Sequence, residues 1–121
     1  MNVEEFEKLR GGEWEDEVYT IYKSSVGTSW TDLLSITTKK MPSAIVGIAL
    51  NNDASYSWDI YREGKTVFPD RTMRSEGMES NMKEVPFFIP IEERQKIVIK
   101  AKADSGTVAV KMRIRLRYYR R

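Results

Sequence analysis

Seven basic side chains in the last quarter of the chain have the spacing of a surface that recognises negative charge. They alternate with apolar residues at the period of two that is typical of a β-strand with one buried and one exposed face. The seven are Lys96, Lys100, Lys102, Lys111, Arg113, Arg115 and Arg117. Such a row of cations can contact phosphates, carboxylates or an acidic protein surface.

The pattern predicts that two strands carry these cations and form a hairpin through the turn Asp104-Ser105-Gly106. Both strands would then point their cations the same way. Side chains two residues apart on a strand are separated by about 6.7 Å, and unit charges at that distance repel by about 0.6 kcal/mol in water. The apolar residues expected to face inward are Ile97, Ile99 and Ala101 on one strand and Val108, Val110, Met112, Ile114, Leu116 and Tyr118 on the other.

Three environments could relieve this repulsion. The cations could be splayed into solvent or face glutamates across the strands, or they could bind nucleic acid or another polyanion. They could also face the acidic N-terminal segment of the same chain or of a neighbour. Residues 1–17 carry seven acidic side chains against Lys8 and Arg10, a net charge of −5, and residues 95–121 carry nine basic side chains against Asp104, a net charge of +8. The whole chain has a net charge of only +2.

Residues suited to catalysis are scarce in this sequence. The chain has no histidine and no cysteine, which removes the commonest general base, the commonest metal ligands and any disulfide. No phosphate-binding glycine loop, nucleophile elbow or zinc motif occurs. The acidic residues beside turns are typical of solvated caps: Asp53, Asp59, Glu63 and Asp70. We therefore expect no catalytic residue, cofactor or metal, and a protein that is not an enzyme.

Short strands separated by turns fill the chain after Gly12. We expect strands over residues 17–26, 32–38, 43–50, 55–63, 66–68, 85–89, 95–103 and 107–119. Their number and spacing predict an all-β fold, an antiparallel β-sandwich of about eight strands that is jelly-roll-like. Residues 1–16 would form an acidic arm or a short helix ended by Gly11-Gly12, and residues 17–121 the sandwich domain.

Two apolar segments are candidate protein interfaces. In residues 85–91, Phe87, Phe88 and Ile89 follow one another between Pro86 and Pro90. This arrangement predicts an edge strand with apolar groups on both faces, or an irregular stretch over one end of the core. The polar segment 69–82 contains three methionines that could contact a neighbour or belong to a solvated loop: Met73, Met78 and Met82.

The tryptophans suggest different environments. Trp58 alternates with polar residues and is expected in the core, whereas Trp14 lies in the acidic entry segment. Trp30 belongs to a turn. A tryptophan in a turn could stack on a sugar ring, so a carbohydrate-binding module is a further alternative, although a lid packed over the end of the core is the more ordinary role for such a residue.

The order of strands and turns resembles that of small β-sandwich virion structural proteins of phages and archaeal viruses. The resemblance rests on SWTDLLSITTKKMPSAIVGIALNN, YSWDIYREGKTVFPD and FFIPIEERQKIVIKAKADSGTVAVKMRIRLRYYRR. It implies a structural subunit of a capsid, a decoration layer or a tail, found in the virion or the host cytoplasm. Its partners would be other subunits, in a homo-oligomer or a capsid-type assembly. Nucleic acid remains a possible partner, and no signal peptide or membrane-spanning segment is expected.

Overall fold

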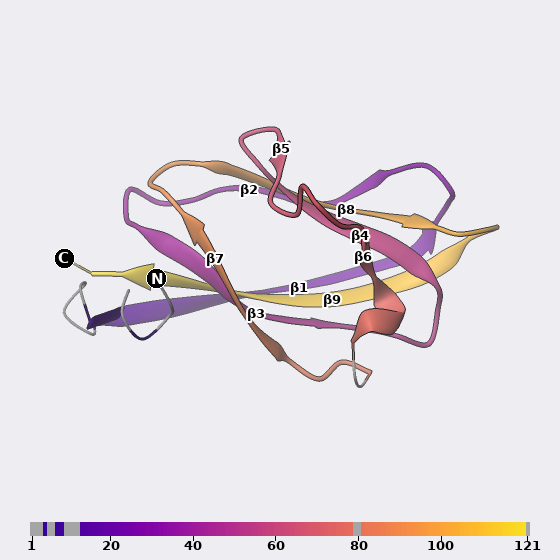
Figure 1. The fold of residues 1–121 in the computed structure, drawn as a ribbon, viewed down its shortest axis with the longest axis horizontal. Coiled ribbons are helices and arrows are strands. Elements are labelled where there is room, and N and C mark those ends of the chain that lie inside the picture. The colour runs from indigo at the N-terminus through magenta and orange to yellow at the C-terminus, as the bar shows by residue number, and fades with distance from the viewer. Residues whose placement is uncertain (1–3, 5–6, 9–12, 79–80, 121) are drawn as a thin grey trace.

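Two antiparallel sheets pack face to face in the computed structural model, which describes residues 4, 7, 8, 13–78 and 81–120 (Figure 1). The four-stranded sheet, here called sheet A, has the order β1-β9-β3-β7, and sheet B has the order β2-β8-β4-β5, with β6 also paired to β4. The predicted all-β sandwich is confirmed. The elements are β1 (Trp14–Val26), β2 (Thr31–Thr37), β3 (Ser43–Leu50), β4 (Tyr56–Arg62), β5 (Lys65–Thr66), β6 (Met73–Arg74), η1 (Ser75–Gly77), β7 (Val85–Ile91), β8 (Lys96–Ala103) and β9 (Val108–Tyr119).

The strand pairs are nested, which defines a jelly roll. β1 pairs with β9, β2 with β8, β3 with β7 and β4 with β6. Such nesting is what results when one long hairpin is rolled up, and the roll is closed by the pairs β3–β9 and β4–β8. The first and last strands of the chain therefore lie side by side.

The predicted hairpin between the two basic strands is wrong. β8 and β9 are consecutive in sequence, but β8 lies between β2 and β4 in sheet B, whereas β9 lies between β1 and β3 in sheet A. The connection through Asp104 and Gly106 passes from one sheet to the other instead of reversing within one sheet. The seven cations are consequently divided between the two outer faces of the sandwich. Alternation and turn residues locate strands but do not determine which strands pair.

The start of the chain agrees only in part with the predicted boundaries. β1 begins at Trp14 rather than at Glu17, so part of the expected acidic arm belongs to the sandwich. Of the expected helix, the structure describes Glu4, Glu7 and Lys8, which are helical, and the other residues between 1 and 12 lie outside the described part.

Alternating side chains from both sheets fill the core, as the sequence predicts. On β9 the residues from Val110 to Tyr118 in steps of two are buried, and their neighbours face outward. Trp58 is fully buried and packs edge-on against Phe68 and Phe87 at ring separations of 5.6 and 6.2 Å. The expectation that Trp58 belongs to the core is confirmed.

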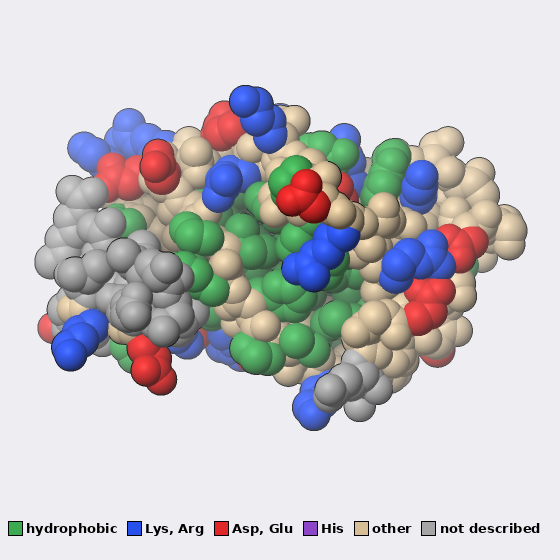
Figure 2. All heavy atoms as spheres, viewed as in Figure 1, with side chains coloured by type: hydrophobic (Ala, Val, Ile, Leu, Met, Phe, Trp, Pro, Cys, Tyr) green, Lys and Arg blue, Asp and Glu red, His purple; other side chains and the backbone are tan. Residues whose placement is uncertain are grey.

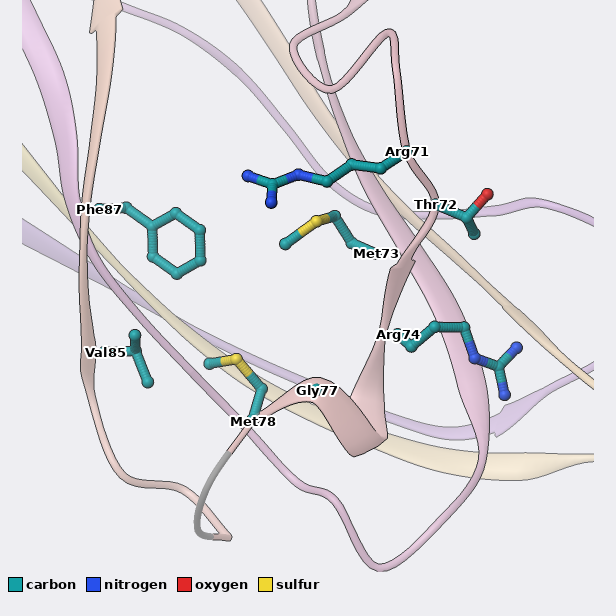
Figure 3. A pocket seen from close by; sticks show the side chains of 8 residues that line it. All are labelled: Arg71, Thr72, Met73, Arg74, Gly77, Met78, Val85 and Phe87. Atoms are coloured by element: carbon teal, nitrogen blue, oxygen red, sulfur yellow. The ribbon is translucent and has the colours of Figure 1, made fainter.

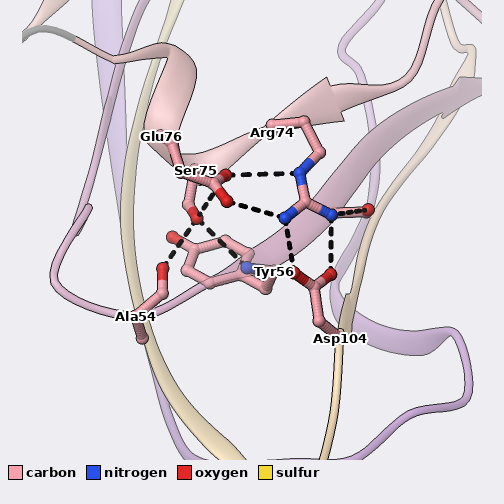
Figure 4. Close-up of polar contacts among 7 residues, drawn as sticks. Ala54, Tyr56, Arg74, Ser75, Glu76 and Asp104 are labelled. Atoms are coloured by element: carbon pink, nitrogen blue, oxygen red, sulfur yellow. Dashed lines mark hydrogen bonds and ion pairs between the residues drawn. The ribbon is translucent and has the colours of Figure 1, made fainter.

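The segment between β5 and β7 is anchored to sheet B by a polar network (Figure 4). The buried Ser75 hydroxyl donates to the carbonyl of Ala54 at 2.7 Å and accepts from the backbone N–H of Tyr56 at 3.1 Å. Beside it, the guanidinium of Arg74 contacts the carboxylates of Glu76 and Asp104. These contacts position β6 and η1, which the sequence did not predict.

Replacing Ser75 should test this anchor. Ser75→Ala leaves a buried N–H and a buried carbonyl without this partner, so we expect the free energy of unfolding to fall by about 1–3 kcal/mol. Urea denaturation measures the change. Ser105→Ala is the matched control, because Ser105 lies in an exposed bend and its loss should change stability by less than about 0.5 kcal/mol. Equal stability of the two variants would contradict the role given to Ser75.

Candidate interaction surfaces

The cations of sheet A lie on its outer face between the acidic strand β1 and the central strand β3. They are the four outward residues of β9, namely Lys111, Arg113, Arg115 and Arg117. Arg117 is held most closely. Its Nε lies 2.8 Å from Oδ1 of Asp16, its Nη1 lies 2.6 Å from Oε1 of Glu7, and its guanidinium stacks 4.7 Å from the ring of Trp14. A cation with two carboxylates and an aromatic face is satisfied within its own chain.

Arg115 contacts two carboxylates. Its Nε donates to Oε1 of Glu84 at 3.0 Å, and its Nη1 lies 3.3 Å from Oδ2 of Asp16. Gly47 is the cross-strand neighbour of Arg115 on β3, and a Cβ atom there would lie 2.6 Å from Cδ of Glu84. The glycine therefore leaves the space through which Glu84 reaches the arginine.

These contacts shift the pKa values of the groups involved. Hydrogen bonds from Arg117 lower the pKa of Asp16 below its usual 3.8, against an opposing effect of burial, and Arg115 adds to the lowering. The hydrogen bond to Asp16 in turn raises the pKa of Arg117. Of the environments considered for the basic row, Arg117 contacts the acidic N-terminal segment of the same chain, and Arg115 contacts both that segment and a glutamate from elsewhere in the sheet, Glu84.

The cations of sheet B have aromatic partners. Lys100 lies 3.6 Å from a carboxylate oxygen of Asp32, with its ammonium 4.9 Å from the ring centre of Tyr61. The ammonium of Lys102 lies 4.9 Å from the ring centre of Trp30. Lys96 is exposed at the start of β8. Because Lys102 covers one face of Trp30, the tryptophan considered for sugar stacking is already part of a cation–π contact.

The segment 85–91 forms the edge strand that its prolines predicted. β7 is the last strand of sheet A, and its pairing with β3 shifts between Ile45 and Gly47. Ile89 is buried, whereas Phe87 and Phe88 are half-buried. The strand thus combines the predicted edge position with a local irregularity.

A pocket of about 360 Å³ opens between β7 and the segment containing β6 and η1 (Figure 3). The side chains of Met73, Met78, Val85 and Phe87 point into it, and Arg71 extends across it. Figure 2 shows hydrophobic side chains gathered along this opening between the two sheets. Met78 is buried, whereas Met73 is half-buried.

Met82 lies apart from this pocket. It has a positive φ of 59°, and its backbone N–H donates to the carbonyl of Leu50 at 2.9 Å. The three methionines singled out in the sequence are thus not gathered at one surface.

An apolar row on β1 was not singled out by the sequence analysis. Three large hydrophobic side chains on the outer face of this strand are exposed: Trp14 (43% exposed), Val18 (45%) and Tyr22 (63%). They recur every four residues, so they share one face of the strand, whereas Tyr19 and Ile21 face the core. That spacing could have revealed the row, but only with the knowledge that the core lies on the other side.

Among the described residues, no group of three or more histidine, cysteine, aspartate or glutamate side chains could hold a metal ion. No helix in the described part of the chain has the length and apolarity needed to cross a membrane.

The fold and these surfaces define a jelly-roll β-sandwich in which two of the four outward cations of β9 are paired with carboxylates. No family model and no curated protein matches the chain. Among solved structures it is similar to a protein from a study titled "Bacillus endospore appendages form a novel family of disulfide-linked pili", with a TM-score of 0.56, 9% identity and 89% coverage of both chains. It also matches VP2 of the infectious bursal disease virus subviral particle, with a TM-score of 0.37 and 16% identity over 88% of this chain but 38% of that one. At 9% identity, the likeness to the appendage protein establishes the fold alone.

Removing the Asp16 carboxylate should weaken sheet A in a pH-dependent way. Asp16→Asn leaves Arg117 and Arg115 with one charged partner fewer, so we expect a loss of about 1–2 kcal/mol in the free energy of unfolding near neutral pH. Because the pKa of Asp16 is lowered in the folded state, its stabilisation is present above pH 3.8 and is lost as the pH falls through the folded value. The deficit of the variant should therefore disappear in acid.

Urea denaturation at several pH values measures this deficit. Asp70→Asn is the control, because Asp70 is an exposed residue in a turn, and it should show no comparable deficit at any pH. A deficit of Asp16→Asn that stays constant down to acidic pH would contradict the charged contact.

Proposed function

We propose that this protein is a non-enzymatic assembly subunit that binds other protein subunits through the outer side of sheet A. The observation that carries the proposal is the exposed row of Trp14, Val18 and Tyr22 on an edge strand. Tryptophan and tyrosine beside arginine is the composition that dominates the binding energy of protein interfaces. Trp14 and Tyr22 each contact a cation of β9 within the chain, yet all three side chains of the row remain at least 43% exposed.

The similarity to the spore-appendage protein supports an assembly role. That protein shares the fold over 89% of both chains, and the endospore appendages to which it relates are described as disulfide-linked pili. The present chain has no cysteine, so its contacts with neighbours would be non-covalent. They would have to be provided by apolar and hydrogen-bonding surfaces.

The charge distribution supports a contact that depends little on charge. Arg115 and Arg117 already contact Asp16, Glu84 and Glu7 of their own chain. An exchange of charged ends between neighbours would have to break these pairs before forming equivalent ones. An apolar contact requires no such exchange.

A virion is the setting that we propose for this assembly. The order of strands resembles that of small virion proteins, and jelly rolls are a common architecture of viral capsids. The role would be that of a capsid, decoration or tail-associated subunit. Because one fold serves many functions, this finer role depends on the sequence resemblance and not on the fold.

Light scattering gives the solution mass that tests the proposal. The chain has a mass of 14.1 kDa, and we expect a discrete multiple of it at high protein concentration. This oligomer should persist at about 1 M salt, where charges are screened beyond roughly 3 Å. A monomer at every concentration and salt would contradict self-assembly, and a multiple that dissociates in salt would favour the exchange of charged ends.

A further inference from the structure

We propose that a second copy of this chain pairs with the outer edge of β1, antiparallel and in a single register centred on Val18. This inference rests on the proposed assembly function and names the partner and the geometry. The two copies would be related by a two-fold axis, and their sheets A would join into one continuous sheet.

The outer edge of β1 is suited to pairing with a further strand. β1 has 13 residues and stands at the end of sheet A, and none of the other strands that the structure describes pairs with its outer side. It contains neither proline nor glycine. The opposite edge strand, β7, contains Pro86 and Pro90, which lack the N–H needed for further pairing. Of the two edges of sheet A, β1 is the one able to accept another strand.

The register of the two β1 strands is limited by side-chain orientation. The joined sheet has one continuous outer face only if outward-facing residues of one copy lie opposite outward-facing residues of the other. A two-fold axis at Glu17 would place the two Glu17 residues opposite each other, and an axis at Asp16 would do the same for Asp16. Like charges directly opposite are destabilising, so these registers are disfavoured.

An axis at Val18 matches the exposed apolar side chains of the strand. Val18 then faces Val18 of the second copy, and Trp14 faces Tyr22, so each exposed apolar residue meets another. Glu13 faces Lys23, which are opposite charges. An axis at Tyr19 would instead place Trp14 opposite Ser24. An axis at Thr20 would pair Val18 with Tyr22 but would place Trp14 opposite Val26, which is buried in the core of its own subunit.

Repulsion between the basic rows of the two β9 strands is weak in the joined sheet. In the joined sheet the strands β9 of the two copies are separated by both β1 strands, a distance of about 14 Å at the usual strand spacing. This exceeds the screening length of about 8 Å at physiological ionic strength. Asp16 also lies between each basic row and the junction, where it contacts Arg115 and Arg117. Charge therefore does not oppose the pairing.

Single cysteines in this cysteine-free chain test the register. In Val18→Cys the two new side chains would lie directly opposite, at a Cα separation of about 4.5–5.5 Å that a disulfide can span. We expect a covalent dimer under mild oxidation. Thr20→Cys is the matched control on the same face of the strand. Its two copies would be offset by four residues, about 13 Å, and should remain monomeric on a denaturing gel.

The outcomes separate this inference from the proposed function. A dimer for Val18→Cys alone supports the register. Cross-linking of both variants, of Thr20→Cys alone, or of neither in a protein that light scattering shows to be oligomeric, overturns the β1 pairing and leaves the assembly function standing. A wild-type protein that is monomeric throughout overturns both.

A charged variant tests the pairing without introducing a cysteine. Val18→Lys places two ammonium groups at the proposed axis, whereas in the monomer the side chain lies on an exposed surface. We expect a folded protein, with a thermal transition close to that of the wild type, whose solution mass no longer includes the β1-paired dimer. A folded Val18→Lys protein with unchanged mass would also overturn the pairing.

Discussion

The pairing of the first strand with the last is the interaction on which the rest of the structure depends. It closes the jelly roll and places the acidic residues of β1 beside the basic residues of β9. Arg117 and Arg115 lie on a strand with neighbours on both sides, which brings carboxylates of the neighbouring segments within reach. Asp16 and Glu84 supply the negative charge that this position requires, and Gly47 supplies the space.

This neutralisation changes what the outer face of sheet A can offer to a partner. A row of unpaired cations would attract phosphates, and its affinity would depend steeply on salt. Arg115 and Arg117 have carboxylate partners within the chain, and the edge of the sheet also exposes the apolar side chains of β1. The charges then act mainly to join the strands, and the apolar row becomes the feature suited to a neighbouring subunit.

Much of the fold follows from the sequence, because alternation is a local signal. The strands, the edge position of β7 and the burial of Trp58 all came from side-chain types and turns. The hairpin of the basic strands did not, because a turn such as Asp104-Ser105-Gly106 can reverse a chain within one sheet or carry it to the other. That choice depends on which strands the whole core brings together. The β1 row was missed for a related reason: its side chains alternate with partly buried ones, and only the packed sheets show which face is outside.

Amide hydrogen exchange is the measurement that tests most directly whether β1 is the assembling edge. The exchange of peptides from residues 14–26 and 85–91 would be compared between dilute and concentrated protein. Pairing at β1 predicts slower exchange of residues 14–23 in the concentrated sample and unchanged exchange in 85–91. Protection of 85–91 alone, or equal exchange of 14–23 at both concentrations in a protein that has assembled, would contradict the account.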